Sequence, residues 1–160
     1  MRKPCNASHG LRTVSHTMLD MAVLKIEAPA FDAMLAACKA AHPYEACGLL
    51  GGRDEWAFVH VPVPNAAADP ARRFDMDPRE FGRALRDLGA RSLAVVAVYH
   101  SHPRTAPAPS RADIEEFSYP DAYSIIVGLA SLRPQVRAFR IFPELGRAVE
   151  VRWMKVAARP

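Results

Sequence analysis

Cysteine is scarce in this 160-residue sequence, which contains only Cys5, Cys38 and Cys47. The number is odd and no C-x-x-C pair occurs, which argues against a disulfide framework and against a cysteine-based zinc cluster. Such usage is typical of a reducing compartment, so we expect a cytoplasmic protein.

Long apolar runs are also missing, although half of the residues are hydrophobic. No stretch approaches the roughly 18 uncharged apolar residues of a membrane-spanning helix, so a membrane is not an expected partner. The formal charge is +4, and Lys and Arg are scattered rather than gathered in blocks. Nucleic acid is therefore not an expected partner either, whereas a mildly basic surface suits an acidic protein.

The first twenty residues, MRKPCNASHGLRTVSHTMLD, contain no apolar segment and show no periodicity. They do not resemble a secretory signal. We expect residues 1–20 to be a disordered N-terminal extension and residues 21–160 to form a single domain. His9 and His16 lie in that extension and are poor candidates for metal ligands.

Hydrophobic periodicity predicts a fold of mixed α/β or α+β class. Apolar residues at helical spacing predict helices over 28–43, 77–91 and 109–120. Short apolar or alternating runs predict strands. The first strand begins at residue 23, and the second, over 45–52, closes with a glycine turn. The other predicted strands cover 55–64, 92–100, 122–130, 135–142 and 148–156. Because strands and helices interleave, we expect one mixed β-sheet flanked by helices.

The most apolar strand, over 92–100, runs directly into His100 and His102. Side chains two apart on a strand point to the same face, so both imidazoles can approach a single ion while Ser101 turns away. Pro103 lacks an amide proton and ends the strand.

A proline-rich loop after the two histidines leads to Ser110 and Asp113, at the start of a predicted helix. The carboxylate of Asp113 would add a third ligand to His100 and His102. Two histidines and one carboxylate leave a fourth tetrahedral position open for water, which is the pattern of catalytic zinc. Zinc lowers the pKa of such a water to about 7.

Each half of this pattern also has a simpler interpretation. A pair of histidines at a strand end can be partly buried polar residues without a ligand. Ser110 and Asp113 have the spacing of a capping box, which stabilises a helix start without any catalytic role. The joint occurrence of the strand, the proline and the carboxylate favours a site, and Ser110 can cap the helix and still serve it.

The segment HSHPRTAPAPSRAD, residues 100–113, matches the pattern H-x-H-P-x6-S-x-x-D. The segment HPYEACGLLGG, residues 42–52, places Glu45 ahead of an apolar strand. In motif, order and spacing the chain resembles the JAMM (MPN+) zinc metallopeptidase family over roughly residues 24–155.

The resemblance implies a curved mixed β-sheet flanked by helices, similar to that of cytidine deaminases. It implies that His100, His102 and Asp113 bind Zn²⁺. Glu45 would be the general base that takes a proton from the zinc-activated water and passes it to the leaving amine. Ser110 would donate a hydrogen bond to the oxyanion.

The resemblance also indicates a substrate class. The compact chain is similar to the small prokaryotic branch of the family, whose members process sulfur-carrier proteins of ubiquitin fold. We therefore expect a hydrolase that acts at the C-terminal Gly-Gly tail of such a carrier, with a homodimer as one assembly to consider. An extended tail could add to a sheet edge beside the metal.

Two other functional classes stay open. One is a non-catalytic MPN scaffold within a complex, which the full ligand set disfavours. The other is a non-haem iron oxygenase that uses two histidines and a carboxylate. In those enzymes the carboxylate commonly lies much closer to the first histidine. A nucleobase deaminase is disfavoured because H-x-E and P-C-x-x-C are missing, and a zincin is excluded because H-E-x-x-H is missing.

Overall fold

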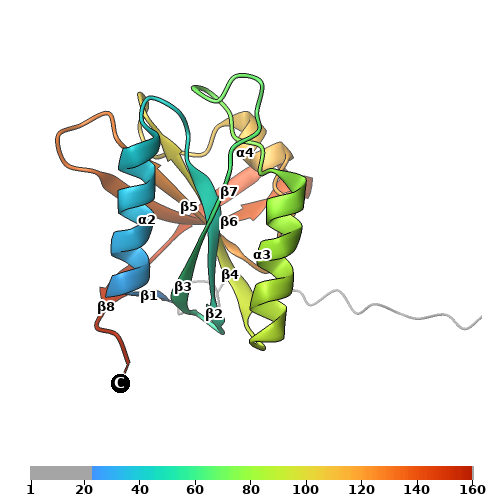
Figure 1. The fold of residues 1–160 in the computed structure, drawn as a ribbon. Helices are drawn as coiled ribbons and strands as arrows, with labels where there is room; N and C mark the ends of the chain where they lie inside the picture. The colour runs from blue at the N-terminus through green and yellow to red at the C-terminus, as the bar shows by residue number, and fades with distance from the viewer. Residues whose placement is uncertain (1–22, 160) are drawn as a thin grey trace, which may run out of the picture.

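The computed structural model describes residues 23–159, so the expectations for residues 1–20, including His9 and His16, lie outside the described residues. A mixed eight-stranded sheet has the order β7-β6-β5-β4-β2-β3-β1-β8 (Figure 1). The strands are β1 (Leu24–Glu27), β2 (Cys47–Arg53), β3 (Trp56–Val63), β4 (Ala94–His102), β5 (Tyr123–Gly128), β6 (Gln135–Phe142), β7 (Arg147–Val151) and β8 (Trp153–Val156). The helices are α2 (Ala28–Ala41), α3 (Pro78–Ala90), α4 (Arg111–Glu115) and the 3₁₀ turn η1 (Pro143–Leu145).

The predicted final strand over 148–156 is wrong, because the chain forms two strands there that lie at opposite edges of the sheet. β7 pairs with β6, whereas β8 pairs in parallel with β1, and only Arg152 separates the two strands. The amide of Leu24 donates to the Arg152 carbonyl at 3.1 Å. One residue can link the two edges only because the sheet curves nearly into a barrel, which confirms the expected curved mixed sheet.

The two long helices cover opposite faces of the sheet (Figure 1). On the α2 face, Met34 and Cys38 pack against Leu50 and Tyr99. On the α3 face, Leu88 belongs to a cluster that includes Leu49 and Val98. Neighbouring residues of β2 and β4 therefore contribute to different cores, as the alternation of side chains on a strand requires. The central strands β4 and β5 are buried on both faces.

The glycine pair Gly51–Gly52 does not form the predicted turn. Both residues lie within β2, where the register against its two neighbours shifts. The reversal falls at Asp54 and Glu55, with Asp54 at a φ of 53°. A Cβ on Gly52 would lie 1.8 Å from the Trp56 carbonyl oxygen, so glycine permits the close approach of β2 and β3 at this bulge.

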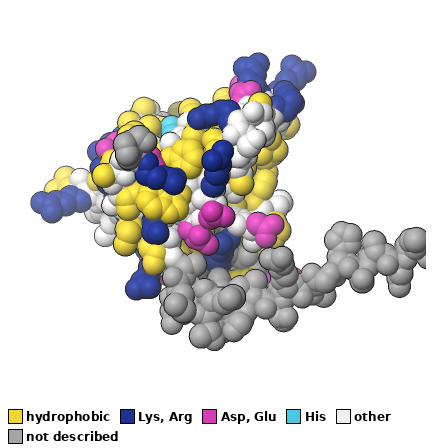
Figure 2. Space-filling view, turned by 90° about the horizontal axis from the view of Figure 1, so that it is seen from below, with side chains coloured by type: hydrophobic (Ala, Val, Ile, Leu, Met, Phe, Trp, Pro, Cys, Tyr) yellow, Lys and Arg dark blue, Asp and Glu magenta, His cyan; other side chains and the backbone are white. Residues whose placement is uncertain are grey.

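Basic side chains are dispersed over the face of the molecule seen from below in Figure 1. Figure 2 shows Lys and Arg interspersed with apolar and acidic side chains on that face. Among the described residues, none of the helices is long and apolar enough to span a membrane.

Candidate metal centre

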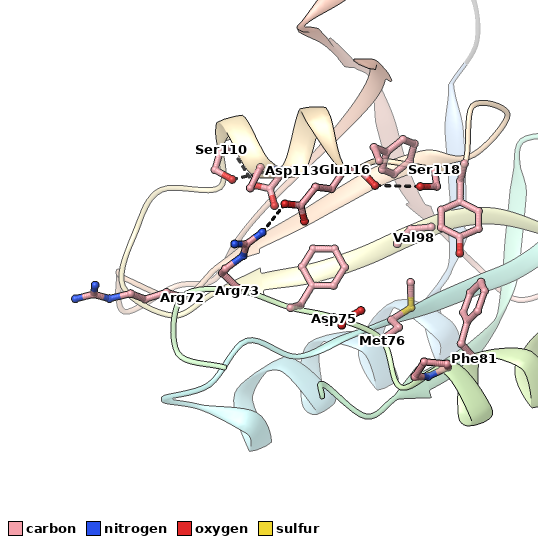
Figure 3. A pocket seen from close by; sticks show the side chains of 15 residues that line it. Arg72, Arg73, Asp75, Met76, Phe81, Val98, Ser110, Asp113, Glu116 and Ser118 are labelled. Atoms are coloured by element: carbon pink, nitrogen blue, oxygen red, sulfur yellow. Dashed lines mark hydrogen bonds and ion pairs between the residues drawn. The ribbon is translucent and has the colours of Figure 1, made fainter. Parts of the chain in front are cut away.

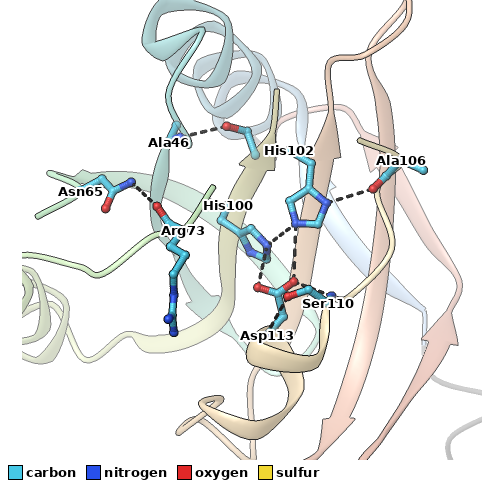
Figure 4. A network of polar contacts seen from close by, with 9 residues as sticks. Ala46, Asn65, Arg73, His100, His102, Ala106, Ser110 and Asp113 are labelled. Carbon is cyan, nitrogen blue, oxygen red and sulfur yellow. Dashed lines mark hydrogen bonds and ion pairs between the residues drawn. The ribbon is translucent and has the colours of Figure 1, made fainter. Parts of the chain in front are cut away.

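β4 delivers His100 and His102 to the α3 face of the sheet, the same face as Val98 (Figure 4). Both histidines are almost completely buried, with exposed fractions of 2% and 7%. Ser101 points to the other face, where its Oγ accepts a hydrogen bond from the Ala46 amide at 2.9 Å. Strand alternation thus arranges this part of the cluster as predicted.

α4 begins with a capping box that also fixes Asp113. The Ser110 Oγ accepts from the Asp113 amide at 3.1 Å, and the Ser110 amide donates to Asp113 Oδ2 at 2.7 Å. Since Oγ acts as acceptor in the cap, the Ser110 hydroxyl proton stays available to another group. The capping interpretation of this sequence is therefore correct, and it is compatible with a role in the site.

The two histidines and Asp113 converge on one point. Each offers a ligand atom, and the three atoms lie within 4.8 Å of one another. The Nε2 atoms of His100 and His102 are 3.0 Å apart, and they lie 3.3 and 3.5 Å from the two carboxylate oxygens of Asp113. The structure therefore brings together the three residues that the sequence nominated as ligands.

The donor set fits a divalent cation. His102 Nδ1 lies 2.9 Å from the Ala106 carbonyl oxygen, which can only accept, so this ring nitrogen carries the proton. In the neutral ring, which is the form that binds a metal, the Nε2 atom of His102 then carries the lone pair, and this atom faces the cluster. Orientation of a histidine through its other nitrogen is the usual support for a metal ligand. Two imidazole nitrogens and one carboxylate form the typical set for catalytic zinc.

Burial and mutual contact set the protonation of the cluster. Burial lowers the pKa of His100. Burial also opposes protonation of His102, but hydrogen bonds to Asp113 and Ala106 and the nearby carboxylates raise its pKa overall. Burial would raise the pKa of Asp113, yet contacts with both histidines hold it well below its usual range. Asp113 is therefore an anion beside two imidazoles, which favours a bound cation.

Glu45 lies two residues before β2, the strand that pairs with β4 beside the cluster. The register Cys47↔His100 between β2 and β4 continues through a hydrogen bond from the Ser101 amide to the Ala46 carbonyl at 3.0 Å, so Glu45 stands opposite His102. Its side chain is 7% exposed. Burial raises the pKa of Glu45 to about 7, opposed by His102 and reinforced by Asp113. A buried carboxyl with such a pKa can exchange a proton near neutrality.

Two residues near the site escaped the sequence analysis. The Phe74 ring stacks on His100 with ring centroids 4.4 Å apart. Asn65 Nδ2 donates to the carbonyls of Glu45 and Arg73, both at 2.9 Å, and its Oδ1 accepts from the amides of Ala67 and Asp75. Asn65 thus ties the backbone of Glu45 to the loop that carries Phe74. The only sequence signal was a polar residue after a strand, which is common in loops.

We expect Asn65→Ala to lower the rate of metal-assisted hydrolysis at this cluster at least about tenfold, because displacement of a catalytic group by about 1 Å can cost 10²-fold. The loss of four hydrogen bonds should also cost about 1–3 kcal/mol of unfolding free energy. The matched control is Asp77→Ala, which removes the two bonds that Asp77 accepts from Arg79 and Glu80 at the start of α3. Thermal melts and kcat measurements should show a stability loss in both variants but a kcat loss only at Asn65; equal kcat values would contradict this role.

Other histidine, cysteine and tryptophan residues of the described chain have structural roles. Cys47 is buried, and its thiol donates to the Val63 carbonyl oxygen at 3.4 Å. His60 is half-buried, and its Nε2 lies 2.8 Å from the Tyr99 hydroxyl. Trp56 packs under Lys25 and Arg159, and His42 caps the C-terminal end of α2.

Comparison with known proteins assigns the chain to a family. A family model described as "Prokaryotic homologs of the JAB domain" matches residues 27–142. The "CysO-cysteine peptidase" of Mycobacterium tuberculosis is 34% identical over 122 residues, which cover 74% of this chain and 83% of the relative. The "Probable TtuB-protein conjugate cleaving protease" of Thermus thermophilus is 36% identical over 91 residues, or 57% of this chain and 60% of the relative.

A solved structure has a similar fold. A protein of Desulfitobacterium hafniense, solved in solution, superimposes with a TM-score of 0.71 at 30% identity and covers 84% of this chain and 93% of its own. The matched family model extends from the end of β1 to the end of β6 and includes both β4 histidines. The chain therefore belongs to the family of prokaryotic JAB-domain homologues and is a JAMM-type metallopeptidase.

Proposed function

We propose that this protein is a zinc-dependent peptidase that cleaves the bond after the C-terminal Gly-Gly of a ubiquitin-like or sulfur-carrier protein. The observation that carries the proposal is the convergence of His100, His102 and Asp113 within 4.8 Å, with the buried Glu45 just before the neighbouring strand β2. The names of the two relatives, one acting on CysO-cysteine and one on TtuB-protein conjugates, support this substrate class. The carrier and the enzyme would meet in the cytoplasm.

His100, His102 and Asp113 would hold the ion through two imidazole nitrogens and a carboxylate oxygen. Zinc, when bound there, supplies a Lewis acid for the scissile carbonyl and lowers the pKa of water. Burial of both histidines keeps bulk solvent away from the ligand atoms. The Ala106 carbonyl keeps His102 in the tautomer that leaves Nε2 free.

Glu45 would act as the general base and then as the general acid. Its carboxylate accepts a proton from the attacking water and gives it to the leaving amine, so that the amide bond breaks with no net change in protonation. Its pKa of about 7 without a metal suits both directions of this transfer. Asn65 would hold the Glu45 backbone in place through its 2.9 Å bond.

Ser110 would stabilise the negative charge that develops on the carbonyl oxygen. Its Oγ accepts from the Asp113 amide, which orients the hydroxyl proton away from the helix. One such donor contributes about 3 kcal/mol to transition-state stabilisation.

The decisive experiment uses zinc-loaded protein and a panel of ubiquitin-fold sulfur carriers from the same genome, each extended by a few residues after its Gly-Gly end. Mass spectrometry should detect a carrier that ends at Gly-Gly. A chelator should abolish the reaction, and one equivalent of zinc should restore it. Stoichiometric zinc without cleavage of any carrier would instead favour the non-catalytic scaffold.

Metal analysis of protein purified without added metal addresses the iron oxygenase. Zinc at about one ion per chain agrees with the peptidase and with the preference of an open His₂-carboxylate site for hydrolysis. Iron in that position, together with oxygen consumption, would overturn the proposal.

A further inference from the structure

A cavity of about 310 Å³ lies beside the metal cluster and has no part in the chemistry above (Figure 3). It is enclosed by α3, α4, β4 and the loop over 72–76. Its apolar lining consists of Phe74, Met76, Phe81, Val98, Phe117 and Tyr119. Such a cavity suits an uncharged side chain, and its volume is at the low end of the roughly 300–1,000 Å³ typical of ligand pockets.

The cavity is continuous with the candidate active site. Ser110 and Asp113 line it, so two members of the site form part of its wall. Val98 precedes His100 by two residues on the same face of β4, which corresponds to about 7 Å along the strand. Phe74 lines the cavity and also stacks on His100. A side chain held in the cavity would therefore belong to a residue next to the scissile bond.

The mouth of the cavity is polar and carries charges of both signs. Arg73 forms an ion pair with Glu116 across the opening, and Asp75 and Asp113 lie nearby (Figure 3). With Arg72 also in the lining, two arginines and three carboxylates border the cavity, so charge of one sign does not dominate it. The apolar interior then decides which side chain is preferred.

We propose that this cavity binds the side chain of the residue immediately after the scissile bond and selects an apolar residue such as leucine, methionine or phenylalanine. The inference rests on the proposed function. In a Gly-Gly tail the two residues before the bond have no side chains, so the nearest side chain that can fill a cavity adjacent to the metal belongs to the residue after the bond. The available space equals that of roughly ten water molecules, enough for one large side chain.

The test measures kcat/KM for one cleaved carrier that ends in Gly-Gly-X, with X as Ala, Leu, Met, Phe, Asp or Lys. Burial of the larger apolar side chains should raise kcat/KM about 10–100-fold over alanine. Aspartate and lysine should be cleaved no faster than alanine. In a second series the residue before Gly-Gly is varied while X stays leucine, and kcat/KM should change less than about threefold, since a pocket effect is worth 10-fold or more.

Two variants connect the preference to the cavity. Met76→Trp fills it and should reduce the leucine-to-alanine ratio of kcat/KM to about 1, because the apolar gain is lost. Leu85→Trp is the matched control on α3, at a partly exposed residue outside the lining, and should leave the ratio unchanged. The ratio is measured within one variant, so a partial loss of folded protein does not affect it.

The outcomes separate the two proposals. If none of the Gly-Gly-X carriers is cleaved, the proposed function itself is wrong. Three results would overturn the cavity assignment and leave the peptidase activity standing. They are equal cleavage rates for all X, an unchanged leucine-to-alanine ratio in Met76→Trp, and selectivity that follows the residue before Gly-Gly.

Discussion

Glu45→Gln is expected to lower the rate of carrier cleavage about 10²–10⁴-fold, the contribution typical of general acid–base catalysis. Glutamine keeps the size of the side chain but cannot accept the proton. The variant should still bind one zinc ion per chain, because Glu45 is not among the three clustered ligand atoms. Cleavage kinetics and metal analysis of the same preparation test both statements.

The matched control is Glu27→Gln, because Glu27 is the other buried glutamate of the described residues. Its exposed fraction is 8%, and it pairs with Arg159 at 3.0 Å. This variant should lose some stability through the broken ion pair but retain full activity. Cleavage by Glu45→Gln at more than a tenth of the wild-type rate would remove Glu45 from the mechanism.

The same variant has a stability signature in metal-free protein. The folded-state pKa of Glu45 is about 7 against an ordinary value of 4.5, so its ionised form is disfavoured by folding. This penalty is absent below pH 4.5 and complete above pH 7. Wild type should therefore lose stability relative to Glu45→Gln between pH 5 and pH 8. The difference in unfolding free energy should grow by up to about 3 kcal/mol, and the difference in melting temperature should grow with it. A difference that is constant with pH would contradict the buried, proton-binding carboxyl.

Asp113→Asn is expected to abolish zinc binding and cleavage together. Loss of the anionic ligand should weaken zinc binding by more than about 100-fold, since even residues that only support a ligand account for 10–100-fold. The asparagine oxygen can still accept from the Ser110 amide, so the start of α4 should stay folded. Zinc titration and circular dichroism of the variant measure the two effects separately.

Ser110→Ala is the control for the capping contribution. It removes the acceptor for the Asp113 amide and should cost about 1 kcal/mol of stability. Zinc should remain bound, while the rate should fall about 10²–10³-fold if the hydroxyl stabilises the oxyanion.

Zinc binding by Asp113→Asn with wild-type affinity would exclude Asp113 as a ligand and would require a different metal site.

The local parts of the site could be predicted from the sequence because they depend on short-range geometry. His100 and His102 share a face since side chains alternate on any strand. The Ser110–Asp113 cap follows from the spacing of a helix start. The helix over 28–41 and the strands β2 and β3 likewise follow from local periodicity, although the turn between the two strands falls at Asp54–Glu55 and not at the glycine pair.

The tertiary structure decided what depends on residues far apart in the chain. The antiparallel register of β2 and β4 brings Glu45 opposite His102, and no local pattern determines a register between strands about 50 residues apart. Curvature of the sheet split residues 148–156 into β7 and β8. The cavity beside the cluster exists only where α3, α4 and the loop of Phe74 pack over β4. The sequence determined which chemical groups the protein carries; packing decided which of them meet, because side-chain proximity across a sheet is a property of long-range pairing.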